Sequence, residues 1–263
     1  MDLRGASVLL TGATGGIGHA IARALHAQGA SLILTGRRGE VLDDLAGELS
    51  AQVVACDLSD RDAVAALAEA HTGVDVLIAG AALPASGPLL DYTVEQLDRS
   101  LDVNVRAPLM LAHALAPHMV ARGRGHIVFI SSLAGLSGQA GSALYSAGKF
   151  ALRGLGQGLR GDLAPSGVGV TTVFPGFVRD AGMFHNSGAE LPGIVGTSTP
   201  EQVADGVVRG ITRNKGEVIV APVAMRVGAR FGMLAPETGA RLARLSGGDR
   251  VSRDIARGQA HLR

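Results

Sequence analysis

An apolar run, a glycine-rich turn and the start of a helix follow one another in Val8-Leu9-Leu10-Thr11-Gly12-Ala13-Thr14-Gly15-Gly16-Ile17-Gly18. Glycines in such a turn let the backbone approach a pyrophosphate closely, and the N-terminus of the following helix favours the negative charge of that group. The order strand, turn, helix is the context that a dinucleotide-binding turn requires. The stretch therefore predicts the first strand and the first helix of a dinucleotide-binding fold.

Apolar runs and helical patterns alternate along the rest of the chain. We expect strands at 6–10, 31–34, 52–55, 74–78, 126–130, 168–173 and 217–220. We expect helices at 17–28, 41–49, 61–70, 93–122, 142–163 and 200–212. This alternation predicts an α/β fold, a single doubly wound Rossmann-type domain whose central parallel sheet of about seven strands has helices on both faces. The domain is expected at residues 1–222, followed by a basic helical extension at 223–263.

Composition narrows the class of protein. The 263 residues are 47% hydrophobic and 18% charged, which is typical of an ordered globular protein. Cys56 is the only cysteine, so we expect neither an internal disulfide framework nor a metal site. Aromatic residues make up only 3% of the chain, so no stacking platform for nucleic acid is expected. No signal peptide and no membrane-spanning run are apparent, and we expect a cytoplasmic protein.

Tyr145 and Lys149 are four residues apart in a predicted helix and therefore share one face. A nearby ammonium group favours the phenolate form of tyrosine. The pair predicts an acid/base group that moves a proton on or off an alcohol oxygen. The alternative is a buried tyrosine whose hydroxyl is satisfied by a backbone carbonyl.

The end of the second predicted strand reads Leu34-Thr35-Gly36-Arg37-Arg38. A carboxylate at this place would bind the ribose 2′-hydroxyl, whereas a guanidinium group would bind a 2′-phosphate. Arg37 and Arg38 therefore favour NADP over NAD. The alternative is that both are ordinary solvated loop residues.

Several further motifs occur in a familiar order: Cys56-Asp57-Leu58, Asn104, Ser132 thirteen residues before Tyr145, and Pro175-Gly176. With the glycine-rich turn and the Tyr/Lys pair, they make the chain resemble the short-chain dehydrogenase/reductase superfamily over nearly all of residues 5–221. The resemblance implies hydride transfer between nicotinamide and a carbonyl or secondary alcohol.

The resemblance also implies roles for individual residues. Ser132, rather than Ser131, would hold the substrate oxygen, Tyr145 would transfer the proton, and Lys149 would lower the Tyr145 pKa and bind the nicotinamide ribose. Asn104 would hold a water in the proton relay, and Asp57 would contact the adenine amino group unless it caps a helix beginning near Ser59. The implied cofactor residues are Gly12, Thr14, Gly15, Gly16, Ile17, Gly18, Arg37, Arg38, Asp57, Leu58, Gly80, Asn104, Tyr145, Lys149, Pro175, Gly176 and Val178.

Two stretches depart from the family pattern. Ala79-Gly80-Ala81-Ala82 stands where the family has Asn-Asn-Ala-Gly, and small residues there would loosen the wall behind the ribose. Asp180 stands where the family has a threonine that bonds the nicotinamide carboxamide. Asp180 would either accept a hydrogen bond from the carboxamide or turn away toward Arg179.

The substrate site is expected at the loops after strands four, five and six, with 83–90 and a lid at 181–199 as mostly apolar parts. These loops favour an uncharged, hydrophobic ketone or alcohol. One alternative is a 3-oxoacyl-thioester reductase, which would need a basic entrance for an acidic carrier, to which Arg122, Arg124 or Arg160 could contribute only weakly. The other is a non-catalytic NADP(H)-sensing protein.

Two features point to contacts beyond the single chain. Gly154, Gly158 and Gly161 lie at helical spacing, which would permit the close approach of another helix. In the family that the chain resembles, the corresponding helix commonly packs between subunits, so the resemblance implies a homodimer or homotetramer. From residue 206 onward the chain carries 11 Lys/Arg and 4 Asp/Glu. Within that region, residues 223–244 read as an amphipathic helix pair interrupted at Pro236. The pair would pack over its own subunit or a neighbour, or else lie on a membrane surface.

Overall fold

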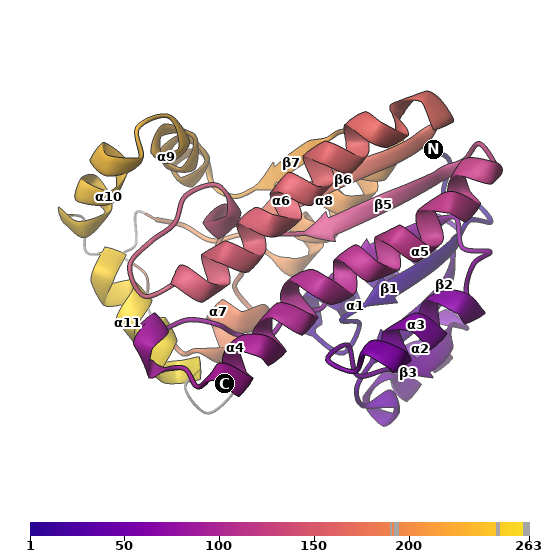
Figure 1. Ribbon diagram of the computed structural model, residues 1–263, viewed down its shortest axis with the longest axis horizontal. Helices are drawn as coiled ribbons and strands as arrows, with labels where there is room; N and C mark the ends of the chain where they lie inside the picture. The colour runs from indigo at the N-terminus through magenta and orange to yellow at the C-terminus, as the bar shows by residue number, and fades with distance from the viewer. Residues whose placement is uncertain (190, 192–194, 246–247, 260–263) are drawn as a thin grey trace.

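The computed structural model describes residues 1–189, 191, 195–245 and 248–259. Seven strands form one sheet in the order β3-β2-β1-β4-β5-β6-β7, and all neighbours pair in parallel (Figure 1). The strands are β1 (Ser7–Thr11), β2 (Ser31–Gly36), β3 (Gln52–Ala55), β4 (Val76–Ala79), β5 (Gly125–Ile130), β6 (Val168–Pro175) and β7 (Glu217–Val220). The predicted doubly wound α/β fold is confirmed.

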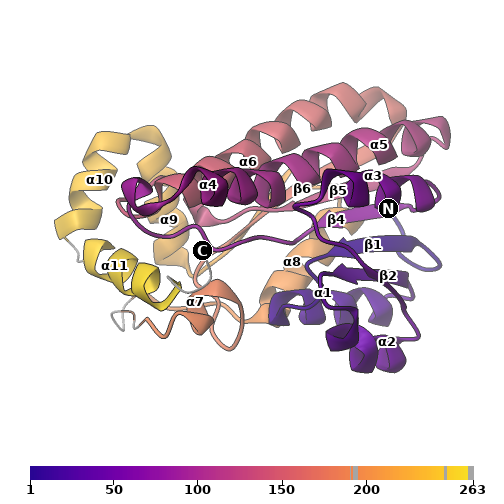
Figure 2. The same ribbon diagram turned by 60° about the horizontal axis from the view of Figure 1, so that its bottom comes forward.

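Helices cover both faces of the sheet (Figure 2). One face carries α1 (Gly16–Ala27), α2 (Asp43–Leu49) and α8 (Pro200–Thr212), and the other carries α3 (Arg61–Ala70), α5 (Ala107–Ala121) and α6 (Ala143–Leu163). Side chains of a strand alternate between the faces, so Val8 and Leu10 join the first core and Leu9 joins the second. Because both faces are buried, the central strands are almost continuously apolar.

Shorter elements complete the chain. They are the single turns η1 (Gly39–Leu42), η2 (Leu89–Asp91), η3 (Asp102–Arg106), η4 (Leu133–Gly135) and η5 (Ala164–Ser166), with the helices α4 (Val94–Leu101), α7 (Gly182–Asn186), α9 (Val223–Leu234), α10 (Pro236–Leu245) and α11 (Gly248–Gln259). Over 93–122, where a helix start followed by a full helix is expected, the structure has α4 and α5, joined by the π-turn η3. The predicted interruption at Pro236 is the start of α10, and α11 lies within the helical extension expected at 223–263.

Strand order reverses direction at β1, which lies between β2 and β4. In such sheets a crevice opens where the strand order reverses, here between the carboxyl ends of β1 and β4. The glycine-rich turn follows β1 and residues 80–83 follow β4, so both meet at this crevice. In both views α9, α10 and α11 lie beyond the carboxyl ends of the strands, at the same end of the molecule as the crevice (Figures 1 and 2).

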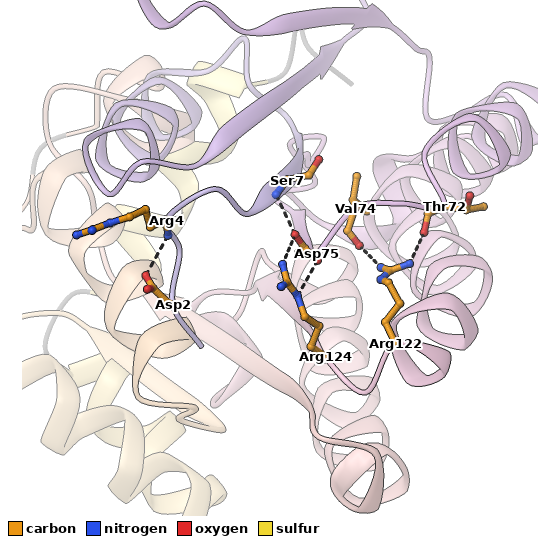
Figure 3. Close-up of polar contacts among 8 residues, drawn as sticks. All are labelled: Asp2, Arg4, Ser7, Thr72, Val74, Asp75, Arg122 and Arg124. Atoms are coloured by element: carbon orange, nitrogen blue, oxygen red, sulfur yellow. Dashed lines mark hydrogen bonds and ion pairs between the residues drawn. The ribbon is translucent and has the colours of Figure 1, made fainter.

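The opposite end of the sheet is closed by arginines (Figure 3). Asp75, just before β4, accepts two hydrogen bonds from Arg124 at 3.1 and 2.8 Å and one from the Ser7 backbone at 3.2 Å. Arg122 donates to the carbonyls of Thr72 and Val74. Arg160 is likewise bound to Asn214 and to the Val170 carbonyl near the start of β6. The expectation that Arg122, Arg124 or Arg160 could contribute weakly to a basic substrate entrance is wrong, because all three brace the amino ends of the strands.

His126 is the one histidine among the described residues that is fully buried, at the start of β5. Its Nε2 lies 2.7 Å from the Thr171 hydroxyl, which donates its own proton to the Lys215 carbonyl at 2.7 Å. Nε2 therefore carries a hydrogen and donates it to the Thr171 hydroxyl. Burial lowers the pKa of His126 to about 3, with smaller contributions from the N-terminal ammonium group and Arg160.

The depressed pKa makes stability depend on pH. Below about pH 6.5 the unfolded chain protonates His126 while the folded chain does not, so the free energy of unfolding falls as pH falls toward 3. The slope from this group is at most about 1.4 kcal/mol per pH unit. We expect urea unfolding between pH 7 and 5 to show this slope in the wild type and to lose it in His126→Gln. His118→Gln, at an exposed position on α5, is the control and should keep it. Equal slopes in wild type and His126→Gln would contradict the assignment.

Candidate active site

The glycine-rich turn fits close to the loop that follows β4. Gly12 has a φ of +76°, and a Cβ there would lie 2.6 Å from the Cα and N of Ala81. A Cβ on Gly16 would lie 2.6 Å from the Ala181 Cβ, and one on Gly18 would lie 2.8 Å from the Ala13 Cα. Side chains are thus excluded at all three positions by backbone or short side chains that cannot move away.

The N-terminus of α1 opens into the crevice without a side-chain cap. The N-cap residue is Gly15, which has no side chain to accept a hydrogen bond, and the first turn holds no acidic residue. The first backbone N–H groups of a helix have no partner within the helix, and the helix dipole favours an anion there. Thr14 and Ile17 line the same cavity. This donor set fits the pyrophosphate of a dinucleotide.

The two arginines after β2 differ in position. Arg37 lines the cavity, whereas Arg38 is exposed outside it. Among the described residues neither arginine has a hydrogen-bond or ion-pair partner within the protein, so the Arg37 guanidinium is available to a ligand. The structure therefore separates the pair that the sequence treats alike: Arg37 fits a phosphate clamp, and Arg38 does not reach the site.

Asp57 lines the cavity beside Leu58, at the end of β3. Its carboxylate accepts hydrogen bonds from the backbone N and the hydroxyl of Ser59, at 3.0 and 2.7 Å. Partial burial opposes ionisation, but these two hydrogen bonds and the charges of Arg37 and Arg99 hold the pKa of Asp57 below its ordinary value. Asp60, and not Asp57, caps α3 by accepting from Asp62 and Ala63. The alternative that Asp57 caps this helix is therefore wrong.

The loop after β4 is fastened at both ends. At one end the Thr11 hydroxyl accepts from the backbone N of Gly80 at 3.1 Å and of Ala81 at 3.3 Å. At the other end Asn104, in the π-turn η3, accepts from the Leu83 backbone N at 2.7 Å and donates to the Leu83 carbonyl at 3.1 Å. The small residues of this loop do not leave it loose, contrary to expectation, because Thr11 and Asn104 hold its backbone.

The Asn104 side chain also donates to the Ser100 hydroxyl at 3.1 Å, is 3% exposed, and does not line the cavity. Both hydrogens of its Nδ2 are used, one on the Leu83 carbonyl of the loop and one on the Ser100 hydroxyl of α4. A water-holding role for Asn104 stays a prediction.

Ser132, Tyr145 and Lys149 converge at the carboxyl end of β5. Tyr145 and Lys149 lie one turn apart on α6, with the Lys149 ammonium 5.5 Å from the centre of the Tyr145 ring. Ser132 follows β5 and its side chain interacts with the Tyr145 phenol. The neighbouring Ser131 donates to the Lys149 carbonyl at 2.8 Å instead. Among these two serines only Ser132 faces the tyrosine.

Burial raises the pKa of Tyr145 more than its interaction with Ser132 lowers it. Burial also lowers the pKa of Lys149 to about 8, and its ammonium donates to the Ile130 carbonyl at 3.0 Å. The expectation that Lys149 lowers the Tyr145 pKa is therefore not met in the protein without ligands. The ammonium is directed at a backbone oxygen and is itself poorly solvated, so the burial of the phenol prevails.

Asp180 takes the second of its two expected orientations. Its carboxylate lies 3.4 Å from the Arg179 guanidinium and is 71% exposed. Asp180 has a φ of +66° and does not line the cavity, whereas its neighbours Val178 and Ala181 do. The side chain is therefore turned away from the place where a nicotinamide carboxamide would lie.

One cavity of about 950 Å³ joins these residues and continues toward the C-terminal helices. Gly80, Pro175, Gly176 and Val178 line the part near the sheet. The predicted lid lies over it through α7 and Leu191, while positions 190 and 192–194 of that lid fall outside the described residues. One side of the cavity was not predicted from the sequence. It belongs to the C-terminal helices and consists of Met225, Phe231, Leu242, Val251, Ser252 and Ile255. Arg99 of α4 was not predicted either, because it looks like any exposed charge on an amphipathic helix.

A sequence model of the family described as short chain dehydrogenase matches residues 6–192. The chain belongs to the short-chain dehydrogenase family. The ketoacyl reductase HetN of a Nostoc species is 34% identical over 227 residues, 83% of this chain and 79% of that protein. An uncharacterized oxidoreductase of Staphylococcus aureus is 34% identical over 226 residues, 82% of this chain and 96% of that protein.

Solved structures of short-chain dehydrogenases share the fold. One from Sphingobium yanoikuyae, in complex with NADPH, is 31% identical with a TM-score of 0.77, covering 92% of this chain and 95% of that one. One from Streptomyces avermitilis is 30% identical with a TM-score of 0.77, covering 95% and 97%. This short-chain dehydrogenase is accordingly an NAD(P)-dependent oxidoreductase acting on CH–OH or C=O groups. No metal-ligand cluster occurs among its described residues.

The raised pKa of Tyr145 can be measured directly, because the chain has two tyrosines and no tryptophan. In Tyr92→Phe the only phenol left is Tyr145. We expect the absorbance of this variant near 295 nm to show ionisation above about pH 10, the ordinary value. Tyr92→Phe combined with Tyr145→Phe, the matched variant, has no phenol and should lack this transition. A Tyr145 midpoint at or below 10 in the unliganded protein would show that Lys149 controls the phenol after all.

Proposed function

We propose that this short-chain dehydrogenase is an NADP-dependent carbonyl reductase or alcohol dehydrogenase, with Tyr145 as the acid/base group. The observation that carries the proposal is the convergence of Ser132, Tyr145 and Lys149 on one cavity with the glycine-rich turn. A protein that only sensed the cofactor would have no use for a phenol placed beside a serine hydroxyl and an ammonium group.

The residues divide the work of reduction as follows. When bound, the nicotinamide supplies the hydride to the carbonyl carbon. Ser132 donates a hydrogen bond to the carbonyl oxygen and orients it toward Tyr145. Tyr145, protonated because burial raises its pKa, delivers its proton to that oxygen as negative charge develops there. Lys149 stabilises the resulting phenolate and contacts the nicotinamide ribose. In the oxidative direction the same groups act in reverse order.

NADP is the proposed cofactor. Arg37 lines the cavity and has no partner among the described residues, and no carboxylate stands at the end of β2 to repel a 2′-phosphate. The glycine-rich turn would hold the pyrophosphate and Asp57 the adenine amino group. Gly80, Pro175, Gly176 and Val178 would surround the nicotinamide end. The NADPH complex of the Sphingobium relative supports this preference.

The proposed substrate is an uncharged, hydrophobic ketone or secondary alcohol. Leu83, Pro84, Phe177, Phe184 and Leu191 line the cavity on the substrate side, together with the apolar wall of the C-terminal helices. Phe177 and Phe184 pack with ring centres 4.8 Å apart. An alcohol dehydrogenase from Comamonas testosteroni described as specific for bulky-bulky ketones, 28% identical with a TM-score of 0.75 over 88% of this chain and 94% of that one, supports a roomy apolar site.

A 3-oxoacyl-thioester reductase is the second candidate. The name of the Nostoc relative favours it. The arginines once expected at its entrance lie at the far end of the sheet, so an acidic carrier would have to meet other basic residues.

We also propose that the protein forms a homo-oligomer, and that the Rossmann-type domain ends at residue 222. On α6, Phe150, Gly154, Gly158 and Gly161 share one exposed face, and a Cβ on any of these three glycines would meet no atom within 4 Å. That open face suits a helix of a second subunit in a dimer or tetramer. Residues 223–263 would form an accessory segment that completes the substrate site rather than a second domain.

The proton role is tested with Tyr145→Phe. We expect NADPH-dependent reduction of a hydrophobic ketone to fall by about 10²–10⁴-fold while NADPH still binds. Tyr92→Phe removes the other phenol, which bonds the Ser86 carbonyl, and should retain activity within a few-fold. Undiminished turnover in Tyr145→Phe would refute the proposed function.

The phosphate clamp is tested with two adjacent variants of the same charge change. Arg37→Asp should weaken NADPH binding by about 10- to 100-fold, the value of charge-assisted hydrogen bonds of about 1.5–3 kcal/mol. Binding of NADH should not weaken. Arg38→Asp lies outside the cavity and should change NADPH binding far less. Nicotinamide fluorescence reports both titrations. Equal losses in the two variants would mean that the arginines act only through general electrostatics.

A further inference from the structure

The outward face of α9 is apolar, although a helix at the edge of a protein normally turns its polar face to water. Val223, Val227 and Leu234 recur at helical spacing and are exposed by 72%, 62% and 85%. Phe231 extends the same stripe. The opposite side of the helix, with Ala229 and Gly232, is buried. The helix therefore packs against the protein through its opposite side, and the exposed apolar residues are those that face away from that contact.

The neighbouring helix continues the apolar surface. On α10, Leu242 and Leu245 are exposed, Leu245 by 85%. The two helices are packed closely: a Cβ on Gly239 would lie 2.9 Å from the Gly232 Cα, and one on Gly232 would lie 2.6 Å from the Ser137 hydroxyl. Figure 1 shows the pair side by side at the end of the molecule beyond the sheet. We define Val223, Val227, Phe231, Leu234, Leu242 and Leu245 as the α9–α10 stripe.

Four arginines accompany the stripe. Arg226 and Arg230 belong to α9, Arg241 and Arg244 belong to α10, and all four are exposed. Within the described part of the chain none of them forms an ion pair, and Glu237 is the single acidic residue on these two helices. Protruding apolar side chains next to unpaired cations match the two layers of a membrane surface, the acyl boundary and the anionic headgroups.

We propose that the α9–α10 stripe binds the surface of an anionic lipid bilayer, with the helices lying in the plane of the interface. No helix of the described residues is long and apolar enough to cross a membrane, so the contact is peripheral. Phe231 and Leu242 belong to the stripe and also line the cavity. The docked face would thus place the mouth of the site against the apolar layer, where a hydrophobic substrate collects.

A second copy of the chain fits this face less well. A two-fold interface brings the same patch of both subunits together. Here such an interface would gather eight arginines and only two glutamates around an apolar contact, so the arginines of the two copies would repel each other. The exposed leucines also stand on convex helices, so a protein partner would have to supply matching pockets, whereas a bilayer adapts to them.

The test is co-sedimentation of the full chain with vesicles of phosphatidylcholine alone or mixed equally with phosphatidylglycerol. We expect binding to the anionic vesicles that weakens with salt. Leu234→Glu combined with Leu245→Glu should reduce it at least tenfold. Leu90→Glu combined with Val94→Glu makes the same charge change at exposed apolar residues on η2 and α4, 96% and 66% exposed, and should retain binding.

A second variant tests the arginine charges separately from the burial of the leucine side chains. Arg241→Gln with Arg244→Gln should weaken binding to anionic vesicles by about fivefold for each charge lost, since each contributes about 1 kcal/mol near such a surface. NADPH binding should stay intact in both double variants and report a folded protein, because none of the four substituted positions touches the site. Leu234, Leu245, Arg241 and Arg244 all lie outside the cavity lining.

Three outcomes would overturn the proposal. Absence of co-sedimentation with anionic vesicles would exclude the lipid surface and leave an acidic protein as the occupant. Equal binding of the Leu234/Leu245 variant and the wild type would place the lipid contact elsewhere. An oligomer that dissociates in this variant, seen by light scattering in the absence of vesicles, would assign the stripe to a second copy. The failure of the proposed reaction would leave the membrane result unaffected, because the two are measured separately.

Discussion

The close approach of two backbones at the switch point constrains the whole site. Gly12 lies so near Ala81 that no side chain fits between them, and the Thr11 hydroxyl accepts from two amides of the facing loop. This contact joins the end of β1 to the end of β4. It directs the N-terminus of α1 into the crevice on one side and, through the loop up to Leu83, sets the wall that faces Tyr145 on the other. Small residues after β4 are therefore a condition for this arrangement, and the departure at Ala79-Gly80-Ala81-Ala82 is compatible with it.

The sheet and the cofactor half of the site could be predicted because they depend on local patterns. An apolar run of four to six residues, a glycine at a positive φ and an i, i+4 pair each determine their structure over a few residues. All but two of the expected cofactor residues line the cavity. The two exceptions, Arg38 and Asn104, each follow a residue that lines the cavity, Arg37 and Val103, but their own side chains do not line it. Sequence spacing does not contain the direction of a side chain.

The rest depended on contacts between distant segments. Whether Lys149 or burial controls the Tyr145 pKa is decided by the surroundings of α6, in particular by the Ile130 carbonyl that takes the ammonium. The Asn104 side chain is hydrogen-bonded to the backbone of Leu83, twenty-one residues away, from a π-turn that no local pattern predicts. Sequence alone leaves a weak contribution of Arg122 or Arg124 to a basic entrance open, and only the topology shows that they lie at the amino ends of the strands.

The C-terminal helices show why the tail of the chain has its unusual composition. Their inner side is apolar where it lines the cavity, at Met225, Val251 and Ile255. On α9 and α10 the outer side is apolar as well, so the ordinary amphipathic division into a buried and a solvated face is missing. Such helices keep a folded, soluble chain only if strong charges flank the apolar surface. The four arginines of α9 and α10 supply those charges, and Glu237 is the single carboxylate on these two helices. A single requirement, two apolar faces on one pair of helices, thus accounts for both the apolar and the basic character of this segment.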